Sequence, residues 1–462
     1  MKVLFISHPN KYEEKPDFPP IGLAYIGAIA KRDGHEVLLI DGGLLNIEKI
    51  LRQAKEFSPE FIGVTCWTIN RAIVWRLINL LSESMPEAFL CVGGQHPTYY
   101  PEHIFLKTNT HAVVTGEGED TISELLQALE NRSDLSEVRG IIFKKNDGVL
   151  VRTAPRPPVE QLDSIPFPYY EGFQNFTFDN YTGIGGADLP GPTAAVITSR
   201  GCVFDCTYCS SVNFWSKRWR SRSAENVLDE MELLVKKWGV RSVYIFDDNF
   251  PVNKKRAVDI CQGIIDRKLN ISWACCGHVK TIDANLLRVM KQSGCVSIDF
   301  GVESGSDIIL KNINKGQSRI DIERTFALVH QAGIKPIAYL MVGNKGESVD
   351  TINSTVEMLG VVKPHLSTGA SLLWLLPGTQ VFKEARANNF ISDDYWIKFD
   401  DVPYNLQEHS YQELFKLRQL LMWGIAKNKG GITPVISYYL KSVYYRFPKL
   451  SIFRALIPNW LR

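Results

Sequence analysis

The sequence predicts an α/β protein built from a doubly wound domain, a partial or full parallel barrel and a helical C-terminal region. Short apolar strands alternate with helical stretches in two separate series. The strands are apolar along almost their whole length, which is typical of parallel sheets covered on both faces. The chain has 462 residues, more than one ordinary core holds, so we expect two or three domains.

Residues 1–135 hold the first series and predict the doubly wound domain. The expected strands are KVLFIS (2–7), EVLLID (36–41), FIGVT (61–65), FLCVGG (89–94) and AVVTGEG (112–118), separated by helices at 23–32, 46–57, 71–85 and 121–129. Open sheets of this kind bind ligands at the carboxyl ends of their strands. Because loops rich in glycine and small polar residues follow several strands, we expect a binding site at that edge.

Residues 136–192 are rich in proline and lack a regular period, so we expect a linker there. The second series follows at 193–385, with expected strands AAVITS (194–199), SVYIF (242–246), ISWAC (271–275), VSIDFG (296–301), KPIAYLMVG (335–343) and TGASLLW (368–374). Six such βα units predict the parallel barrel. Residues 386–462 are expected to be helical and end in an aromatic, basic tail.

Composition excludes several classes of protein. The formal net charge of +2 gives no reason to expect nucleic acid as a partner. No apolar run reaches the roughly 18 residues that span a bilayer, and the N-terminus lacks a secretory pattern. Nine cysteines, unevenly spread, argue against a disulfide scaffold. We therefore expect a protein of the reducing cytoplasm.

The segment SRGCVFDCTYCSS places three cysteines, Cys202, Cys206 and Cys209, directly after the first strand of the second series. Thiolates are the usual ligands of iron–sulfur clusters, and three of them leave one iron of a four-iron cluster without a protein ligand. A structural zinc site is one alternative, but it would need a fourth ligand such as Cys275 or Cys276. A group of buried structural thiols is another.

This cysteine spacing, with Tyr208 before the last cysteine, resembles the signature of the radical S-adenosylmethionine (SAM) superfamily, whose barrel is of the TIM type. The resemblance covers residues 193–385 and continues through RSRSAENVLDEMELL, VYIFDDNF, DFGVESGSDIILKNINKG, MVGNKGES and LLPGT, in the expected order. It implies a [4Fe–4S] cluster whose unique iron binds the amino and carboxylate groups of SAM. One electron then cleaves SAM to a 5′-deoxyadenosyl radical.

The same resemblance implies a set of SAM-binding residues at the strand ends: Tyr208, Arg222, Asp247, Asp248, Glu303, Ser304 and Gly343. For several of these residues, an ordinary structural role is an alternative to SAM binding. The two aspartates would equally cap the next helix, and the arginine would equally lie on the surface. For the glutamate a salt bridge is the less favoured alternative. The loop at Gly343 reads GNKGE where many relatives have proline before the glycine.

The segments FPPIGLAYIGAIAKRDGHEV, VGGQHPTYYPE and VTGEGEDTISELL resemble the Rossmann-like N-terminal domain of cobalamin-binding radical SAM proteins. The resemblance implies cobalamin contacts from Thr65, Gly93, Gly94, His96, Gly116, Glu117 and Gly118. Glycine pairs allow close backbone approach to a bulky ligand. The alternative is that these glycines only turn the chain at an empty sheet edge.

A histidine ligand to cobalt is not expected. The usual pattern is D-x-H-x-x-G, and its nearest match begins at Asp33 and His35 but has Leu38 in place of glycine. The match also precedes a strand instead of following one. His8 is the other candidate within reach, and His96 is expected to pack against a corrinoid edge or cap a loop.

Residues 435–462 contain five Lys/Arg, no acidic residue and many aromatics. Two hypotheses account for them: contact with an anionic membrane surface, or a helix packed over the barrel mouth. Pro448 and Pro458 interrupt any long helix here, which favours the second.

The leading hypothesis for function is methylation of an unactivated carbon, with cobalamin delivering the methyl group. The alternatives are cyclisation or rearrangement with the same cofactors, and a cobalamin or Fe–S binding protein without turnover. The resemblance implies a small-molecule substrate and an external one-electron reductant such as flavodoxin or ferredoxin. The aromatic tail suggests a lipid or other hydrophobic natural-product precursor.

Overall fold

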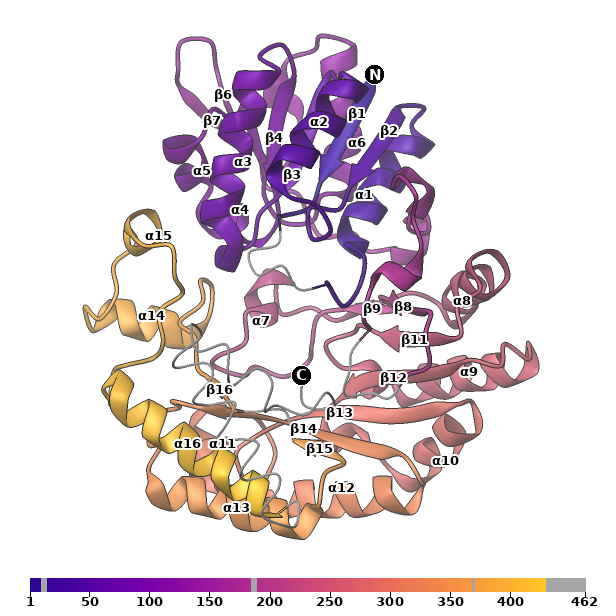
Figure 1. Cartoon of the computed structure of the whole chain (residues 1–462), viewed down its shortest axis with the longest axis vertical. Helices are drawn as coiled ribbons and strands as arrows, with labels where there is room; N and C mark the ends of the chain where they lie inside the picture. Colours follow the sequence, from indigo (N-terminus) through magenta and orange to yellow (C-terminus); the bar gives the residue numbers. More distant parts are fainter. Residues whose placement is uncertain (10–14, 184–188, 368–369, 429–462) are drawn as a thin grey trace, which may run out of the picture.

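The computed structural model describes residues 1–9, 15–183, 189–367 and 370–428. Two seven-stranded sheets dominate the structure, one from the N-terminal part of the chain and one from the middle part. In Figure 1 the first sheet and its helices lie above the second, and the short helix α7 lies between them. The predicted α/β architecture with two βα series is confirmed.

The first sheet has the order β2-β1-β3-β4-β5-β6-β7. Its strands are β1 (Lys2–Ile6), β2 (Glu36–Ile40), β3 (Phe61–Thr65), β4 (Phe89–Gly93), β5 (Ala112–Val114), β6 (Ile141–Lys144) and β7 (Leu150–Arg152). Strands β1 to β5 are parallel, as their continuous apolar character predicts. Six helices accompany them: α1 (Ile21–Arg32), α2 (Ile47–Phe57), α3 (Arg71–Ser84), α4 (Gln95–Tyr99), α5 (Pro101–Lys107) and α6 (Glu119–Glu130).

Strands β6 and β7 differ from the prediction, because they lie in the segment expected to be an irregular linker. They form an antiparallel pair that extends the sheet beyond β5. The two strands are only four and three residues long, too short to show a period, although Ile141, Ile142 and Phe143 are buried. The domain boundaries proposed from the sequence stay a prediction.

The second sheet is parallel throughout, with the order β15-β14-β13-β12-β11-β8 and β16 beside β14. Its strands are β8 (Thr193–Val196), β11 (Ser242–Ile245), β12 (Ser272–Gly277), β13 (Cys295–Glu303), β14 (Lys335–Val342), β15 (Leu366–Ser367) and β16 (Ser371–Leu372). Within the described residues, β8 and β15 are the two edges of this path and do not pair, so the strands form an open, partial barrel.

Helices cover the outer face of the second sheet. They are α8 (Ala224–Trp238), α9 (Lys254–Asp266), α10 (Ala284–Gln292), α11 (Asp307–Asn312), α12 (Arg319–Gln331) and α13 (Val349–Val362). Their ends follow local sequence rules: Ser223 caps α8 and Gly239 ends it in the left-handed conformation. Capping boxes open α12 at Ser318 and α13 at Ser348.

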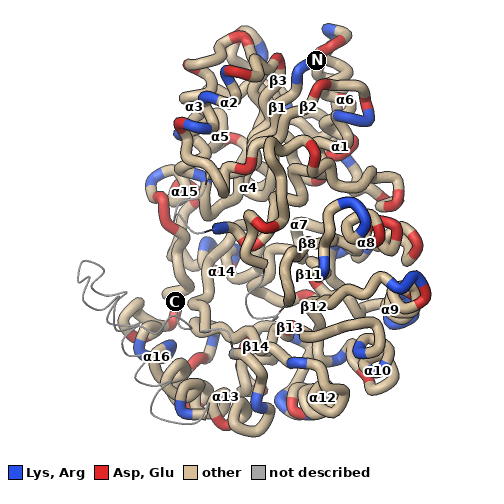
Figure 2. Tube along the Cα trace, turned by 45° about the vertical axis from the view of Figure 1, so that its right-hand side comes forward, with Lys and Arg blue, Asp and Glu red and all other residues tan. Residues whose placement is uncertain are grey.

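The described C-terminal part holds α14 (Gln380–Ala387), α15 (Tyr395–Lys398) and α16 (Tyr411–Asn428). The aromatic tail at 435–462 lies outside the described residues. Among those that are described, no helix combines the length and the hydropathy needed to cross a membrane. Figure 2 shows basic and acidic residues interspersed along the described part of the trace.

Candidate active site

The loop that carries the three cysteines begins at a short antiparallel pair, β9 (Ser199–Arg200) with β10 (Arg220–Ser221). Gly201 follows with φ +87°, and a β-carbon on it would lie 2.0 Å from the carbonyl oxygen of Arg218. Only glycine fits this position, because both the backbone conformation and the close approach exclude a side chain. The chain therefore turns sharply just before Cys202.

Cys202, Cys206 and Cys209 are free thiols, each half-buried. Burial raises the pKa of all three thiols, that of Cys206 to about 11. The thiolate form therefore needs a bound cation or cluster to compensate its desolvation. The loop carrying them is tied to the barrel by Thr207, whose amide donates to the carbonyl of Ile313 at 3.0 Å.

The three sulfurs do not form a compact site for one ion. Within the described parts of the chain, no three His, Cys, Asp or Glu residues converge closely enough to hold a single metal ion. Three thiolates on one loop nevertheless match the donor set of a four-iron cluster, which leaves one iron without a protein ligand. The two cysteines considered for zinc are engaged elsewhere: Cys275 packs in the core, and Cys276 contacts the hydroxyl of Tyr244 at 3.1 Å.

Asp247 holds the backbone that leads into the cysteine loop. Its Oδ1 accepts hydrogen bonds from the amides of Thr198 (2.6 Å) and Ser199 (3.0 Å), and its Oδ2 accepts from both hydroxyls. Burial raises the pKa of the Asp247 carboxyl, although these hydrogen bonds and nearby Arg256 oppose the shift. The side chain neither caps the next helix nor offers a free oxygen to a ligand.

Asp248 lies nearer to the cysteines. Its Oδ1 accepts a hydrogen bond from the Ser211 hydroxyl at 2.8 Å. After burial, its negative charge is the next cause that raises the pKa of Cys209. Asp248 thus lies beside the cysteine loop, while Asp247 holds the backbone that precedes it. A contact of Asp248 with SAM stays a prediction.

Glu303, at the end of β13, lies in a buried group with Tyr208 and Lys315. The Tyr208 hydroxyl donates to Glu303 Oε1 at 2.7 Å, and Lys315 Nζ contacts the same oxygen at 3.1 Å and the Tyr208 oxygen at 2.8 Å. Glu303 has φ +63°, which turns its side chain toward this group. Its Oε2 has no hydrogen-bond partner in the described residues, so it is available to a ligand hydroxyl or ammonium.

Lys315 was not predicted as a site residue, although it lies within the quoted segment DFGVESGSDIILKNINKG. Burial lowers the pKa of its ammonium, but Glu303 and the thiols of Cys206 and Cys209 outweigh burial and raise it. The positive charge in turn opposes the rise in the pKa of Cys206. Because Lys315 and Glu303 are 12 positions apart, no local spacing in the sequence predicts their contact.

The other residues implied for SAM lie in different surroundings. Ser304 is buried, and its hydroxyl contacts that of Thr355 at 3.2 Å. Gly343 has φ +104° at the end of β14, where its carbonyl accepts a hydrogen bond from Asn405 at 2.9 Å. Arg222 is not on the surface: it is buried, pairs with Glu230 and donates to the carbonyl of Ile197 at 3.1 Å.

At the first sheet, Gly93 ends β4 opposite Thr65, which ends β3, and Gly94 follows directly. Gly94 has φ +111° and ψ −165°, and a β-carbon there would lie 2.8 Å from the carbonyl oxygen of Cys66 and 3.2 Å from Thr65 Oγ1. The backbones of β3 and β4 therefore approach each other closely where the two strands end. Gly94 is therefore required by the close approach of the two strand ends, and a contact of these residues with cobalamin stays a prediction.

Replacing Gly94 with alanine is expected to destabilise the protein by about 1–3 kcal/mol, because the required backbone conformation is open essentially to glycine alone. Urea unfolding measures this loss. Gly22→Ala is the matched control, since a β-carbon on Gly22 in α1 meets nothing within 4 Å. Equal stability of the two variants would contradict the role given to Gly94.

His96 is fully buried in α4, against Trp75, Tyr100 and His103. Its Nδ1 contacts Thr68 Oγ1 at 3.3 Å, and burial lowers the pKa of the imidazole to about 3. The ring belongs to the helix layer and is not exposed at the strand ends. A position at a corrinoid edge is therefore not what this packing favours.

Glu117 also has partners within the protein. Its carboxylate is paired with Arg200 and Arg220, two residues of the cysteine hairpin, and only 8% of its side chain is exposed. The flanking glycines keep space on one side: Gly116 has φ +76° and open space where a β-carbon would be. Gly118 instead packs against Ile26.

Two residues at the strand ends deserve more weight than the sequence prediction gave them: Trp67 was not predicted, and His8 was named only as a further candidate. Trp67, just beyond β3, is 48% exposed and lies 5.7 Å from the ring of His8, just beyond β1. A large exposed aromatic next to a strand end was the signal that could have indicated it. His35, by contrast, lies at the amino end of β2 near the chain N-terminus, far along the strand from this edge.

A thiol-rich loop at the carboxyl ends of an open parallel barrel, below a doubly wound domain, defines an Fe–S enzyme with a second cofactor domain. Comparison with known proteins gives the family. The sequence profile of the radical SAM superfamily matches residues 196–359, and that of the B12 binding domain matches residues 13–126.

Relatives agree along most of the chain. An uncharacterized methyltransferase of Pyrococcus horikoshii is 31% identical and covers 90% of each chain. An anaerobic magnesium-protoporphyrin IX monomethyl ester cyclase of Rubrivivax gelatinosus is 28% identical over 83% of this chain and 70% of its own. A cytidylyl-2-hydroxyethylphosphonate methyltransferase of Streptomyces wedmorensis is 27% identical over 77% and 76%.

Two solved structures share the fold. The radical SAM methyltransferase TsrM of Kitasatospora setae has a TM-score of 0.72 at 20% identity, covering 84% of this chain and 76% of its own. The cobalamin-dependent radical SAM enzyme OxsB has a TM-score of 0.75 at 17% identity, covering 96% and 68%. The chain belongs to the radical SAM superfamily, among the members that carry a B12-binding domain.

This membership implies three cofactors: a [4Fe–4S] cluster, SAM and cobalamin. The residues present fit them. Three half-buried thiols on one loop match the donor set of the cluster, Glu303 offers a carboxylate oxygen without a described partner, and the loop after β5 has open space at Gly116.

Proposed function

We propose that this protein is a cobalamin-dependent radical SAM methyltransferase that adds a methyl group to an unactivated carbon of a small molecule. The observation that carries the proposal is the 31% identity, along 90% of both chains, with a relative named as a methyltransferase. Contacts between the two halves support it, because Tyr99 at the end of α4 reaches the carbonyl of Ser210 beside Cys209 at 3.5 Å.

When bound, the cluster and SAM supply a 5′-deoxyadenosyl radical, and cobalamin supplies the methyl group. Cys202, Cys206 and Cys209 would hold the cluster, and Glu303 would accept a hydrogen bond from a SAM hydroxyl or ammonium. Lys315 balances the negative charge of the thiolates, and Asp247 fixes the loop that presents them. These roles are proposals that rest on the contacts described above.

The proposal also covers the reductant, the substrate class and the cellular compartment. The cofactors require an external one-electron reductant such as flavodoxin or ferredoxin, and the substrate is a hydrophobic small molecule such as a lipid or natural-product precursor. We place the protein in the reducing cytoplasm, since all nine cysteines are free thiols.

A second candidate is a cyclase or rearrangement reaction without methyl transfer. It is favoured by the 28% identity with the cyclase of R. gelatinosus. The two candidates differ in the fate of SAM, because only methylation converts SAM to S-adenosylhomocysteine as well as to 5′-deoxyadenosine.

The test uses protein reconstituted anaerobically with iron, sulfide and hydroxocobalamin, then given SAM with a trideuterated methyl group and a strong reductant. We expect S-adenosylhomocysteine to form. With a small-molecule extract of the source cells added, we also expect a product that carries the deuterated methyl group. Formation of 5′-deoxyadenosine without any S-adenosylhomocysteine would overturn methyl transfer and favour the cyclase.

A further inference from the structure

A buried ion-pair network joins the two cofactor domains at one point. The Glu117 carboxylate lies between two guanidinium groups: Arg200 Nη1 is 2.9 Å from Oε2, and Arg220 contacts both oxygens. Arg200 also pairs with Glu119, so two arginines face two glutamates. All four side chains are 5–8% exposed, which shields the network from water and salt.

The arginines belong to the base of the cysteine loop. Arg200 and Arg220 are direct partners in the β9–β10 ladder, and only Gly201 separates Arg200 from Cys202. The Arg200 guanidinium also lies over the ring of Trp215, with 5.5 Å to the ring centroid. A shift of either guanidinium would therefore move the backbone that presents the first cluster ligand.

The glutamates belong to the loop assigned to cobalamin. Glu117 lies between Gly116 and Gly118, directly after β5, and Glu119 is the first residue of α6. An acidic residue in the first turn of a helix is favoured by the helix dipole. The amide of Val159 also donates to Glu117 Oε2 at 3.2 Å, which adds a third anchor to this carboxylate.

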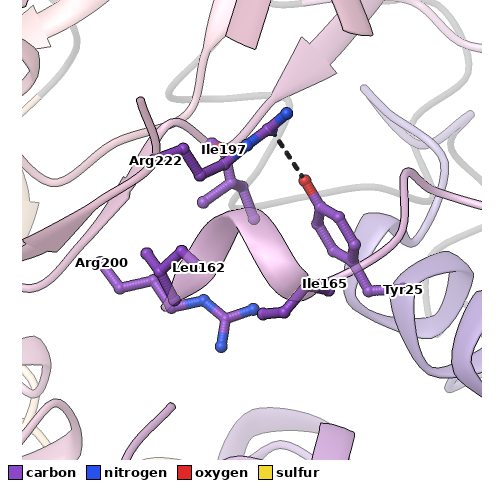
Figure 3. Close-up of a pocket in the computed structure, with 6 residues that line it drawn as sticks. All are labelled: Tyr25, Leu162, Ile165, Ile197, Arg200 and Arg222. Atoms are coloured by element: carbon purple, nitrogen blue, oxygen red, sulfur yellow. Dashed lines mark hydrogen bonds between the residues drawn. The ribbon is translucent and has the colours of Figure 1, made fainter. Parts of the chain in front are cut away.

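The cavity beside the network is too small for an organic ligand. Tyr25, Leu162, Ile165 and Ile197 line a cavity beside Arg200 and Arg222 whose volume is about 10 Å³, enough for about one water molecule. Figure 3 shows Tyr25 reaching from its helix toward Arg222, with its hydroxyl 3.5 Å from Nη1. The charged groups of the network are therefore paired with one another and do not form a substrate-binding site.

Buried ion pairs are a poor device for stability alone, because apolar residues of similar volume often stabilise as well or better. Their best-attested use is to fix one arrangement of the parts that they join. We propose that Glu117, Arg200 and Arg220 are positioning residues that couple the cobalamin loop to the cluster loop. Filling one cofactor site then strengthens binding at the other.

The test measures the dissociation constant of hydroxocobalamin for the full-length protein with and without the reconstituted cluster. In the native protein we expect binding about fivefold or more tighter when the cluster is present, a typical size for coupling between sites. In Glu117→Gln we expect the ratio to fall to about one, with iron and sulfide content unchanged. A native ratio of one, or an unchanged ratio in the variant, would overturn the proposal.

Glu102→Gln is the matched control, because Glu102 pairs with Arg152 on the same domain but both side chains are more than half exposed. It should keep the native ratio. Should Glu117→Gln not fold, Glu117→Asp and Arg220→Lys keep the charge but shorten the reach or remove the guanidinium fork, and they should lower the ratio too. A native ratio in either of these would count against the coupling.

A second readout is the paramagnetic resonance of cob(II)alamin beside the reduced cluster. We expect the magnetic interaction between them to weaken or scatter in Glu117→Gln and to remain in Glu102→Gln. The coupling needs only the two cofactors, so a protein that forms no S-adenosylhomocysteine would leave it intact. Cobalamin that binds without any dependence on the cluster would overturn the coupling alone.

Discussion

Replacing Cys206 with alanine is expected to abolish the cluster and with it the cleavage of SAM. Cys206 is one of three thiols on a loop, and the other six cysteines of the chain lie outside this loop. Loss of a direct ligand should exceed the roughly 10–100-fold loss that removing an outer-shell partner causes. Iron and sulfide content, visible absorption and formation of 5′-deoxyadenosine measure the effect.

Cys261→Ala is the control for loss of a thiol as such. Cys261 is fully buried in α9 and takes no part in the loop. This variant should keep its iron, its absorption and its SAM cleavage. A Cys206→Ala protein that retained a full cluster would show that another group supplies the ligand.

Replacing Asp247 with alanine is expected to destabilise the protein by roughly 3–5 kcal/mol and to prevent cluster assembly. The carboxylate accepts four hydrogen bonds from Thr198 and Ser199, and its removal leaves two amides, two hydroxyls and the Arg256 charge without compensation. Because those residues lead directly into Gly201, the cysteine loop should lose its fixed geometry. Urea unfolding and iron content measure both effects.

Asp247→Asn separates the hydrogen bonds from the charge. Its amide oxygen can accept from both backbone amides, and its NH₂ group can donate to the two hydroxyls, so the loss should be only about 1–2 kcal/mol. The cluster should still assemble. If Asp247 instead bound SAM directly, the asparagine variant would assemble the cluster with native stability yet bind SAM poorly.

Much of the fold could be predicted because its signals are local. The apolar strands predicted in both series are present, and the caps at Ser223 and Ser348 lie at helix starts. The hairpin β6–β7 was not predicted, because strands of four and three residues carry too little periodicity. Their place in the sheet is decided by pairing with β5, some 30 residues earlier.

The roles of the carboxylates could not be read from the chain. The sequence placed Glu117 with cobalamin, yet its partners Arg200 and Arg220 are 83 and 103 positions away. Lys315 joins Tyr208 across 107 positions. The Glu117 contacts come from the packing of the two domains, and the Lys315 contact comes from the curvature of the barrel, so no local sequence pattern predicts either.

The sequence by itself determined the position of the three candidate cluster ligands on one loop and the order of the strands around them. Thiols at 202, 206 and 209 stand on one short loop, so their proximity needs no tertiary contact. The tertiary structure decided which strand-end acids remain available to a ligand. Burial forces every charged group to find a partner, and only folding reveals that Glu117 and Asp247 have theirs while Glu303 keeps one oxygen free among the described residues.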